Sequence, residues 1–262
     1  MRPVLELKHV SHVYVSEKEA SLAIESVDLK VQPGEFISLV GPSGCGKTTL
    51  LSLLAGLLLP TEGEMLFHGK QVKGPSTKVG YMLQQDYLFP WRTIRENALL
   101  GLEVSKQLTD NAGERMEQLL ADMGLDGVAD RYPHELSGGM RQRVALVRTL
   151  MASPEVLLLD EPFSALDMHI KLQLEDLVQL TLTRLGKTAV LVTHDLAEAA
   201  AMSDRVILLG SRPGRIRQIF DIPPDIRELP PTAARRSAGF QDLFDSIWSE
   251  LEAEEGEEAD SP

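Results

Sequence analysis

Runs of apolar residues divide the first ninety residues into strands and one helix. Short, largely alternating apolar stretches predict strands at residues 4–10, 22–31, 36–40 and 79–83. A glycine-rich loop follows Val40 and leads into residues 48–59, whose leucines recur with a helical period. The local order is therefore strand, glycine-rich loop and helix.

The middle of the chain changes to helices, and strands then return. Helical periodicity predicts helices at residues 93–101, 111–123 and 138–151. Strands are again predicted at residues 156–159, 189–192 and 206–209, with helical segments between them. This alternation is typical of an α/β fold with a mainly parallel sheet and crossover helices. The helical block is predicted to be an insertion, and the absence of an internal repeat indicates one copy of the domain.

The last fifty residues combine a proline-rich segment with an amphipathic pattern. Five prolines between residues 210 and 239 predict an extended surface segment. Apolar residues then recur with helical spacing at Phe240, Leu243, Phe244, Ile247, Trp248 and Leu251. We favour packing of this apolar face on the chain's own domain, and contact with a partner subunit is the alternative.

Charge and composition narrow the classes of function. The 262 residues carry 26 basic and 39 acidic side chains, a net charge of −13, which argues against nucleic acid as the main partner. Residues 250–262 hold seven acids and no base, so this tail contributes more than half of the excess and is predicted to be frayed and solvated.

Features of export and of membrane insertion are not expected in this sequence. The longest nearly apolar run, residues 50–59, is too short to span a bilayer, and the N-terminal residues lack the apolar stretch of a signal peptide. A single cysteine, Cys45, excludes an internal disulfide framework and a multi-cysteine zinc site. We therefore expect a protein of the cytosolic type.

Residues 41–49, GPSGCGKTT, match the pattern G-x-x-x-x-G-K-[ST] of a phosphate-binding loop. Glycines let such a backbone wrap closely around phosphates, the lysine supplies positive charge and the Thr48 hydroxyl can ligate Mg²⁺. The predicted phosphate-binding residues are Gly41, Pro42, Ser43, Gly44, Cys45, Gly46, Lys47, Thr48 and Thr49. Cys45 occupies a position where the motif allows any residue, and we interpret it as a small residue there. The alternative is that its thiol is a site where alkylation blocks nucleotide binding.

An acidic pair follows the apolar strand in VLLLDEP, residues 156–162. Ligands of open α/β sheets bind at the carboxyl ends of the strands, where Asp160 is expected. A carboxylate there can hold Mg²⁺, usually through water, and the adjacent Glu161 can orient or deprotonate an attacking water.

A second anion site is predicted at LSGGMRQRV, residues 136–144. Ser137 is a good N-cap, and Gly138 and Gly139 permit a close approach of the backbone. One chain rarely needs two such helix N-termini for one nucleotide, whereas a dimer could use one from each subunit.

These motifs resemble the ATP-binding subunits of ABC transporters over about residues 4–215. Six ordered features carry the resemblance: Tyr14, GPSGCGKTT, Gln84, LSGGM, VLLLDEP with SALD, and His194. The resemblance implies a P-loop NTPase core with an N-terminal antiparallel β part, built from residues 1–90 and 152–215. It also implies a helical subdomain at residues 91–151, followed by an extension at 216–262 with an amphipathic helix and an acidic tail.

The resemblance also implies roles for single residues in a head-to-tail dimer that sandwiches two ATP molecules. Tyr14 would stack on adenine, Asp160 would serve Mg²⁺ together with Thr48 and Gln84, and Glu161 would be the catalytic base. Gln84 would sense the attacking water and His194 would contact the γ-phosphate.

The residues expected at the dimer contact are Ser137, Gly138, Gly139 and Asp167. The first three would approach the ATP of the other subunit, and Asp167 would lie at the seam. Met140 departs from the family pattern, which most often has glutamine there.

Two further segments are similar to a subgroup that imports nitrate, sulfonates, taurine and thiamine precursors. They are LFPW at residues 88–91 and SRPGRI at residues 211–216. Trp91 is either a half-buried aromatic or part of an apolar patch that binds a cytoplasmic helix of the permease. Only about 47 residues follow Arg215, so we expect no β-rich regulatory domain.

The expected partners are therefore a second copy of this chain, membrane permease subunits and, indirectly, an extracellular or periplasmic solute-binding protein, with ATP and Mg²⁺ as ligands. The location implied is the cytoplasmic face of the cell membrane, as a peripheral subunit. The function that the resemblance implies is an ATPase that powers import through a separate membrane permease. The alternatives are an exporter subunit, a soluble ABC protein without a transport role and a non-catalytic interaction module.

Overall fold

Six strands form the central sheet of the computed structural model, which describes residues 2–16 and 19–259. The sheet order is β10-β9-β3-β8-β7-β6. The strands are β3 (Phe36–Val40), β6 (Val79–Met82), β7 (Val156–Asp160), β8 (Thr188–Val192), β9 (Arg205–Leu209) and β10 (Ile216–Asp221). All neighbours are parallel except β10, which runs antiparallel to β9. The largely apolar strands β3 and β8 are buried throughout, as expected for parallel strands covered on both faces.

A smaller antiparallel sheet has the order β2-β1-β4-β5. It consists of β1 (Leu5–Val15), β2 (Ala20–Val31), β4 (Glu62–Phe67) and β5 (Lys70–Gln71). Strand β4 was not predicted, because its first half, Glu62 to Glu64, is exposed and polar. The N-terminal antiparallel part expected from the sequence is thus present and is extended by two further strands.

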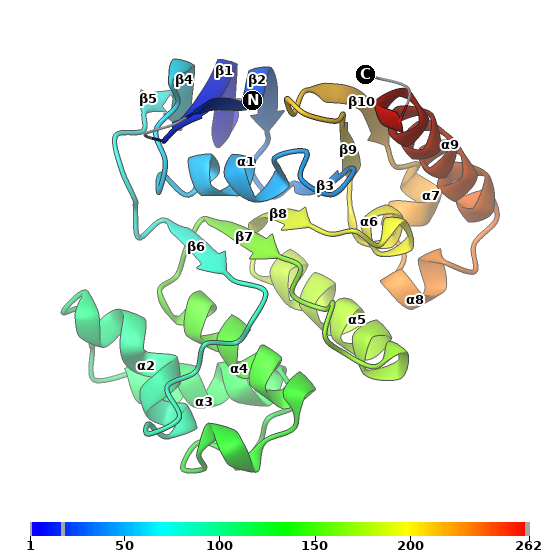
Figure 1. Ribbon diagram of the computed structural model, residues 1–262. Helices are drawn as coiled ribbons and strands as arrows, with labels where there is room; N and C mark the ends of the chain where they lie inside the picture. Colours follow the sequence, from blue (N-terminus) through cyan, green and yellow to red (C-terminus); the bar gives the residue numbers. More distant parts are fainter. Residues whose placement is uncertain (1, 17–18, 260–262) are drawn as a thin grey trace.

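Helices fill the space between and around the sheets (Figure 1). They are α1 (Lys47–Leu54), α2 (Ile94–Val104), α3 (Ala112–Asp122), α4 (Gly138–Met151), α5 (Met168–Arg184) and α6 (Leu196–Met202), with a short 3₁₀ turn at Pro133–Glu135. Helices α2, α3 and α4 pack on one another and lie apart from the antiparallel sheet (Figure 1). No helix among residues 2–16 and 19–259 is both long and apolar enough to cross a bilayer.

Helix α1 is shorter than predicted, because it ends at Leu54 rather than at residue 59. Ala55 is the C-cap, and Gly56 follows with a φ of +70°. A Cβ atom at Gly56 would lie 2.5 Å from the carbonyl oxygen of Gly74. The leucines continue past this point, but the backbone turns because a glycine in the left-handed region ends the helix.

The proline-rich segment is only partly extended as predicted. It contains β10 and two short helices, α7 (Pro224–Arg227) and α8 (Pro231–Ala234). Both helices begin with proline, whose fixed φ suits the first helical position. Prolines therefore start helices in this segment.

Helix α9 (Phe240–Ala259) packs on the chain's own domain, as the favoured interpretation predicted. Phe240 and Ile247 are buried in one apolar cluster with α6 residues, whereas Trp248 stays 47% exposed. The prediction of a frayed tail is wrong as far as residue 259, because α9 continues to that residue. Solvation holds for Glu252, which is exposed, but not for Glu254, which is only 9% exposed. Asp260 lies outside the described residues.

The packing of α9 can be tested with two substitutions on the same helix. Ile247→Ala removes a fully buried side chain, so we expect the free energy of unfolding to fall by about 2–5 kcal/mol. Trp248→Ala should cost clearly less, because that ring is half exposed. Urea denaturation of both variants measures the difference, and equal losses would contradict the packing described.

Candidate nucleotide-binding site

The phosphate loop joins β3 to α1, and two of its glycines are required by their surroundings. Gly41 has a φ of +150°, and a Cβ there would lie 2.5 Å from the carbonyl oxygen of Leu209. Gly46 is the N-cap of α1 with a φ of +97°, and a Cβ there would lie 2.6 Å from the Ile24 side chain. The loop therefore has no room for side chains at these points, and it presents the N-terminus of α1, which favours anions.

Lys47 lies folded over this loop. Its Nζ donates hydrogen bonds to the carbonyl oxygens of Gly41 and Pro42, each at 2.8 Å, and lies 3.7 Å from Cys45 Sγ. The ammonium group is thus held at the loop, where it adds positive charge to the helix N-terminus.

Cys45 fills the space beneath the loop and is 1% exposed. Burial raises the pKa of its thiol, and the nearby Lys47 opposes that shift without cancelling it. The structure therefore agrees with the interpretation of Cys45 as a small packing residue, since a buried thiol with a raised pKa reacts slowly.

A cavity of about 470 Å³ opens beside the phosphate loop. Its walls are Tyr14, Ser21, Leu22, Ala23, Ser43, Gly44, Gly46, Lys47, Thr48, Thr49, Glu161 and Arg212. Tyr14 is 46% exposed, its hydroxyl lies 3.2 Å from Thr49 Oγ1, and its ring meets His12 edge-on at 4.7 Å. Tyr14 is therefore a wall of the cavity and not a core aromatic. The β2 residues and Arg212 were not identified as site residues from the sequence.

Asp160 ends β7, and its environment shifts its pKa. Tyr81, on the adjacent strand β6, donates its hydroxyl to Asp160 Oδ2 at 3.2 Å. Burial raises the pKa of Asp160, and the charge of Glu161 acts in the same direction, while the Tyr81 hydrogen bond and Lys47 oppose the shift. Burial and Asp160 together raise the pKa of Tyr81 to about 12. Tyr81 was missed because only the pairing of β6 with β7 brings it here.

Two of the predicted catalytic residues, Gln84 and His194, converge on one carboxylate oxygen of the third, Glu161. Gln84 Nε2 donates to Glu161 Oε2 at 3.2 Å, and His194 Nδ1 lies 3.3 Å from the same oxygen. Glu161 has a φ of +46°, and its backbone N–H donates to the carbonyl oxygen of Val192 at 2.9 Å. A non-glycine residue in this region is strained, and such strain is characteristic of functional sites.

The segment after β8 positions His194. The next residue, Asp195, caps α6 by accepting the backbone N–H of Glu198 at 3.0 Å. Its other carboxylate oxygen lies 2.7 Å from Lys171 Nζ on α5. The backbone on the C-terminal side of His194 is therefore fixed to two helices.

Helix α4 holds the segment that carries Gln84. Gln142 Nε2 donates to the carbonyl oxygen of Gln84 at 2.9 Å, and Arg148 donates to the carbonyl oxygens of Asp86 and Tyr87. Arg141 Nε donates to the Asp86 carboxylate at 3.0 Å. The contacts of these α4 residues with the Gln84 segment were not predicted, because they join positions about 55 to 62 residues apart.

Residues 136–140, LSGGM, here called the signature residues, lie around the N-terminus of α4 and outside the phosphate cavity. Ser137 caps α4 and accepts the backbone N–H of Met140 at 3.4 Å, and both Ser137 and Gly138 are exposed. A Cβ at Gly139 would lie 2.7 Å from the Ile170 side chain, so α4 and α5 approach closely there. Met140, the departure from the family pattern, packs partly buried against the helical core.

Asp167 is the exposed N-cap of α5, and its side chain makes no capping hydrogen bond. Of the described residues, those that line the phosphate cavity include neither Asp167 nor any signature residue. The structure therefore brings the phosphate loop and Glu161 together at one cavity, and it does not bring the predicted dimer-contact residues to that cavity.

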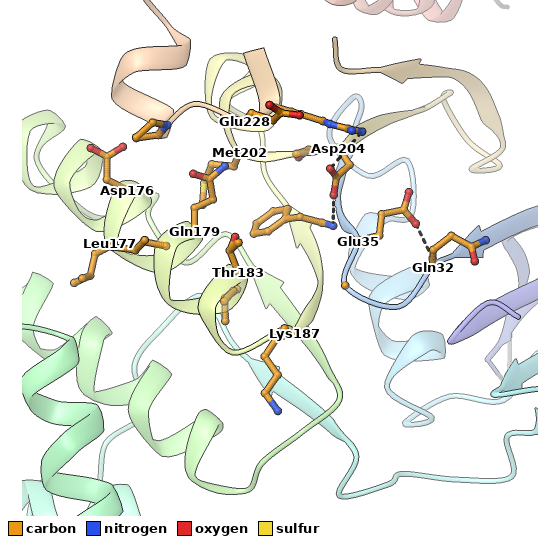
Figure 2. A pocket seen from close by; sticks show the side chains of 18 of the residues that line it. Gln32, Glu35, Asp176, Leu177, Gln179, Thr183, Lys187, Met202, Asp204 and Glu228 are labelled. Atoms are coloured by element: carbon orange, nitrogen blue, oxygen red, sulfur yellow. Dashed lines mark hydrogen bonds and ion pairs between the residues drawn. The ribbon is translucent and has the colours of Figure 1, made fainter. Parts of the chain in front are cut away.

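A larger cavity of about 1080 Å³ lies between the turn at residues 32–36, α5 and the segment around Arg227 (Figure 2). In its wall the Phe36 backbone N–H donates to Asp204 at 2.8 Å, and the Gln32 backbone N–H donates to Glu35 at 2.6 Å. None of the described residues that line it was predicted as a site residue. The candidate chemistry is at the smaller cavity.

Comparison with known proteins agrees with these motifs. The profile of the family described as "ABC transporter" matches residues 24–164. The uncharacterized ABC transporter ATP-binding protein YtlC of Bacillus subtilis is 53% identical over 247 residues, covering 94% of this chain and 95% of that protein. The aliphatic sulfonates import ATP-binding protein SsuB of Bacillus licheniformis is 39% identical, covering 88% of each.

A solved structure shows a similar fold. The dimeric structure of a post-hydrolysis state of the ATP-binding cassette MJ0796, bound to ADP and Pi, aligns with a TM-score of 0.73 at 31% identity. The alignment covers 84% of this chain and 99% of that one.

The burial of Cys45 has a direct chemical consequence. Because it is the only cysteine in the sequence, a thiol reagent reports on this position alone. We expect 5,5′-dithiobis(2-nitrobenzoic acid) to label the folded chain much more slowly than the chain in guanidinium chloride. Equal rates in the two conditions would show that the phosphate loop does not bury the thiol.

Proposed function

The chain belongs to the ABC transporter family of ATP-binding subunits, which are ATPases coupled to transport, and we propose that it is the ATP-hydrolysing subunit of an importer. The observation that carries the catalytic part is the convergence of Gln84, Glu161 and His194 at one carboxylate oxygen, in a residue that also lines the phosphate cavity.

The proposed reaction uses Glu161 as the general base. As the oxygen of a water molecule bonds to the γ-phosphorus, a proton of that water passes to the Glu161 carboxylate. The bond from the γ-phosphorus to the bridging oxygen breaks, and ADP leaves with inorganic phosphate. Gln84 orients the water, and His194 contacts the γ-phosphate from the end of β8.

The residues of the phosphate loop hold the nucleotide in this proposal. The backbone of Gly41–Thr49 surrounds the phosphates, with Lys47 supplying charge, and the half-exposed ring of Tyr14 stacks on the adenine. Tyr14 suits this role because it lines the same cavity as the loop and is 46% exposed.

Mg²⁺ is the metal that this donor set suits. Thr48, Asp160 and Gln84 offer hydroxyl, carboxylate and amide oxygens, which are the ligand types that Mg²⁺ prefers. Tyr81 occupies only one of the two Asp160 oxygens with its 3.2 Å hydrogen bond, which leaves the other for a cation or its water. When bound, Mg²⁺ would neutralise charge on the phosphates.

A head-to-tail dimer would complete the site. Ser137 and Gly138 are exposed at a helix N-terminus that is not part of their own chain's cavity, so a second copy can use them at its γ-phosphate. Gly139 would approach the same phosphate through its backbone, and Asp167 would lie at the seam. The dimeric state of MJ0796 supports this assembly.

An apolar patch beside Gln84 is proposed to bind the permease. Trp91 is 70% exposed, its ring lies 5.2 Å from that of Phe89, and Pro90 and Tyr87 are exposed beside them. Leu88, the first residue of the LFPW segment, is buried and anchors the patch. Since α4 holds this segment, a movement of α4 on ATP binding would reach the patch.

The solute is proposed to be a sulfonate, taurine, nitrate or a related small solute. The similarity to SsuB and the segments at residues 88–91 and 211–216 support this class. A solute-binding protein outside the membrane would deliver the solute, and this chain would lie as a peripheral subunit on the cytoplasmic face. The alternatives are an exporter subunit and a soluble ABC ATPase without a transport role.

The role of Glu161 is tested by Glu161→Gln. The variant keeps the shape of the side chain but cannot accept the proton, so we expect turnover to fall about a hundredfold or more while ATP binding persists. Phosphate release and ATP titration measure the two properties. Near-normal hydrolysis by the variant would remove Glu161 as the base.

The composite site is tested by mixing two inactive variants, Lys47→Ala and Ser137→Arg. If each site takes Lys47 from one chain and Ser137 from the other, a mixed dimer contains one doubly altered site and one intact site. We expect ATP trapped after mixing to exceed that of either variant alone. No gain on mixing, in subunits shown by labelling to have exchanged, would contradict head-to-tail pairing.

A further inference from the structure

The connection between β9 and β10 lies directly against the phosphate loop. Arg212 Nε donates to the carbonyl oxygen of Gly44 at 3.0 Å. A Cβ at Gly214 would lie 2.0 Å from the carbonyl oxygen of Cys45, so the two backbones touch there. This connection, residues 210–215, therefore packs directly against the phosphate loop.

Arg212 brings a guanidinium group to the cavity itself. It lines the same cavity as Tyr14, Lys47 and Thr48. Its Nη2 lies over the bare α-carbon of Gly44, since a Cβ there would be 2.5 Å away. A guanidinium carries five N–H donors, and the bond to Gly44 uses one of them. The geometry of this group matches phosphate oxygens.

Glu254 of α9 holds the connection from its other side. Its Oε1 accepts the Ser211 backbone N–H at 2.7 Å, directly before Arg212. The carboxylate lies on Gly210, where a Cβ would be 2.8 Å from Oε1, and Arg217 Nε lies 3.5 Å from Oε2. Although it belongs to the acidic tail, Glu254 is almost fully buried.

We propose that Arg212 is a further nucleotide-binding residue, which contacts the phosphates of the nucleotide, and that Glu254 is a positioning residue which holds Arg212 at the cavity. The proposal rests on the proposed function of the same site. Under this proposal the C-terminal helix contributes to nucleotide binding, because α9 is connected to the phosphate loop through Glu254, Ser211 and Arg212.

The first experiment compares nucleotide binding by the full chain and its Arg212→Ala variant, with ATP and ADP as ligands in calorimetric titrations. We expect the Kd for both nucleotides to rise about tenfold, because a charge-assisted hydrogen bond is lost. Arg212→Lys should recover part of the loss, and binding by Arg212→Ala should depend less on salt.

Two outcomes overturn the proposal in different ways. If the unaltered chain binds ATP and Arg212→Ala binds it equally well, Arg212 is not a binding residue and the proposed function stands. If the unaltered chain binds no nucleotide, the proposed function fails together with the proposal.

The second experiment is a double-mutant cycle with Glu254. Glu254→Ala should raise the Kd for ADP in the same direction as Arg212→Ala, and the double variant should bind no more weakly than Arg212→Ala alone. Glu252→Ala is the matched control, because Glu252 is exposed on the same helix and should leave the Kd unchanged. Additive effects of the two substitutions would overturn the positioning role.

A further variant guards against loss of folding in Glu254→Ala. Gly210→Ala keeps Glu254 but adds a methyl group where the carboxylate lies, so it should displace the carboxylate and weaken ADP binding. Thermal melts establish that each variant is folded. A folded Gly210→Ala variant with an unchanged Kd would also overturn the positioning role.

Discussion

The parallel alignment of β3, β7 and β8 is the constraint on which the site depends. Parallel neighbours end at the same edge of the sheet, so the phosphate loop after Val40, the acidic pair after Leu159 and His194 after β8 emerge together. The hydrogen bond between the Glu161 N–H and the Val192 carbonyl oxygen joins two of these ends directly. Residues more than a hundred positions apart are thus brought together by strand order, and no long-range side-chain contact is needed to bring them there.

Most strands of the central sheet and the candidate site residues could be predicted from local patterns, because each strand and each motif is contained in a few consecutive residues. What could not be predicted depends on which strands and helices become neighbours. Tyr81 reaches Asp160 only because β6 pairs with β7, and Gln142 reaches Gln84 only because α4 packs beside that loop. The early end of α1 was missed for a related reason, since Gly56 approaches Gly74 from a distant segment.

Hydrogen bonds within the chain form one half of the proposed site, and the other half, the N-terminus of α4, is exposed elsewhere. The loop, Asp160 and Glu161 are held by hydrogen bonds within the chain, whereas Ser137 and Gly138 cap an exposed helix N-terminus. Helix α4 links the two regions, because it begins at the signature and holds the Gln84 segment through Arg141, Gln142 and Arg148. Occupation of the exposed end of α4 by a partner would therefore act on Gln84 through the same helix.

The positive φ of Glu161 destabilises the fold at the residue that is proposed to be the catalytic base. A left-handed backbone costs a non-glycine residue about 1–2 kcal/mol, and that cost is met by the packing of the rest of the sheet. Glycine would relieve it, yet glycine carries no carboxylate. If Glu161 is the base as proposed, a relative released from the need for hydrolysis could exchange it for glycine or asparagine and gain stability, so the residue at this position would separate hydrolysing from non-hydrolysing relatives.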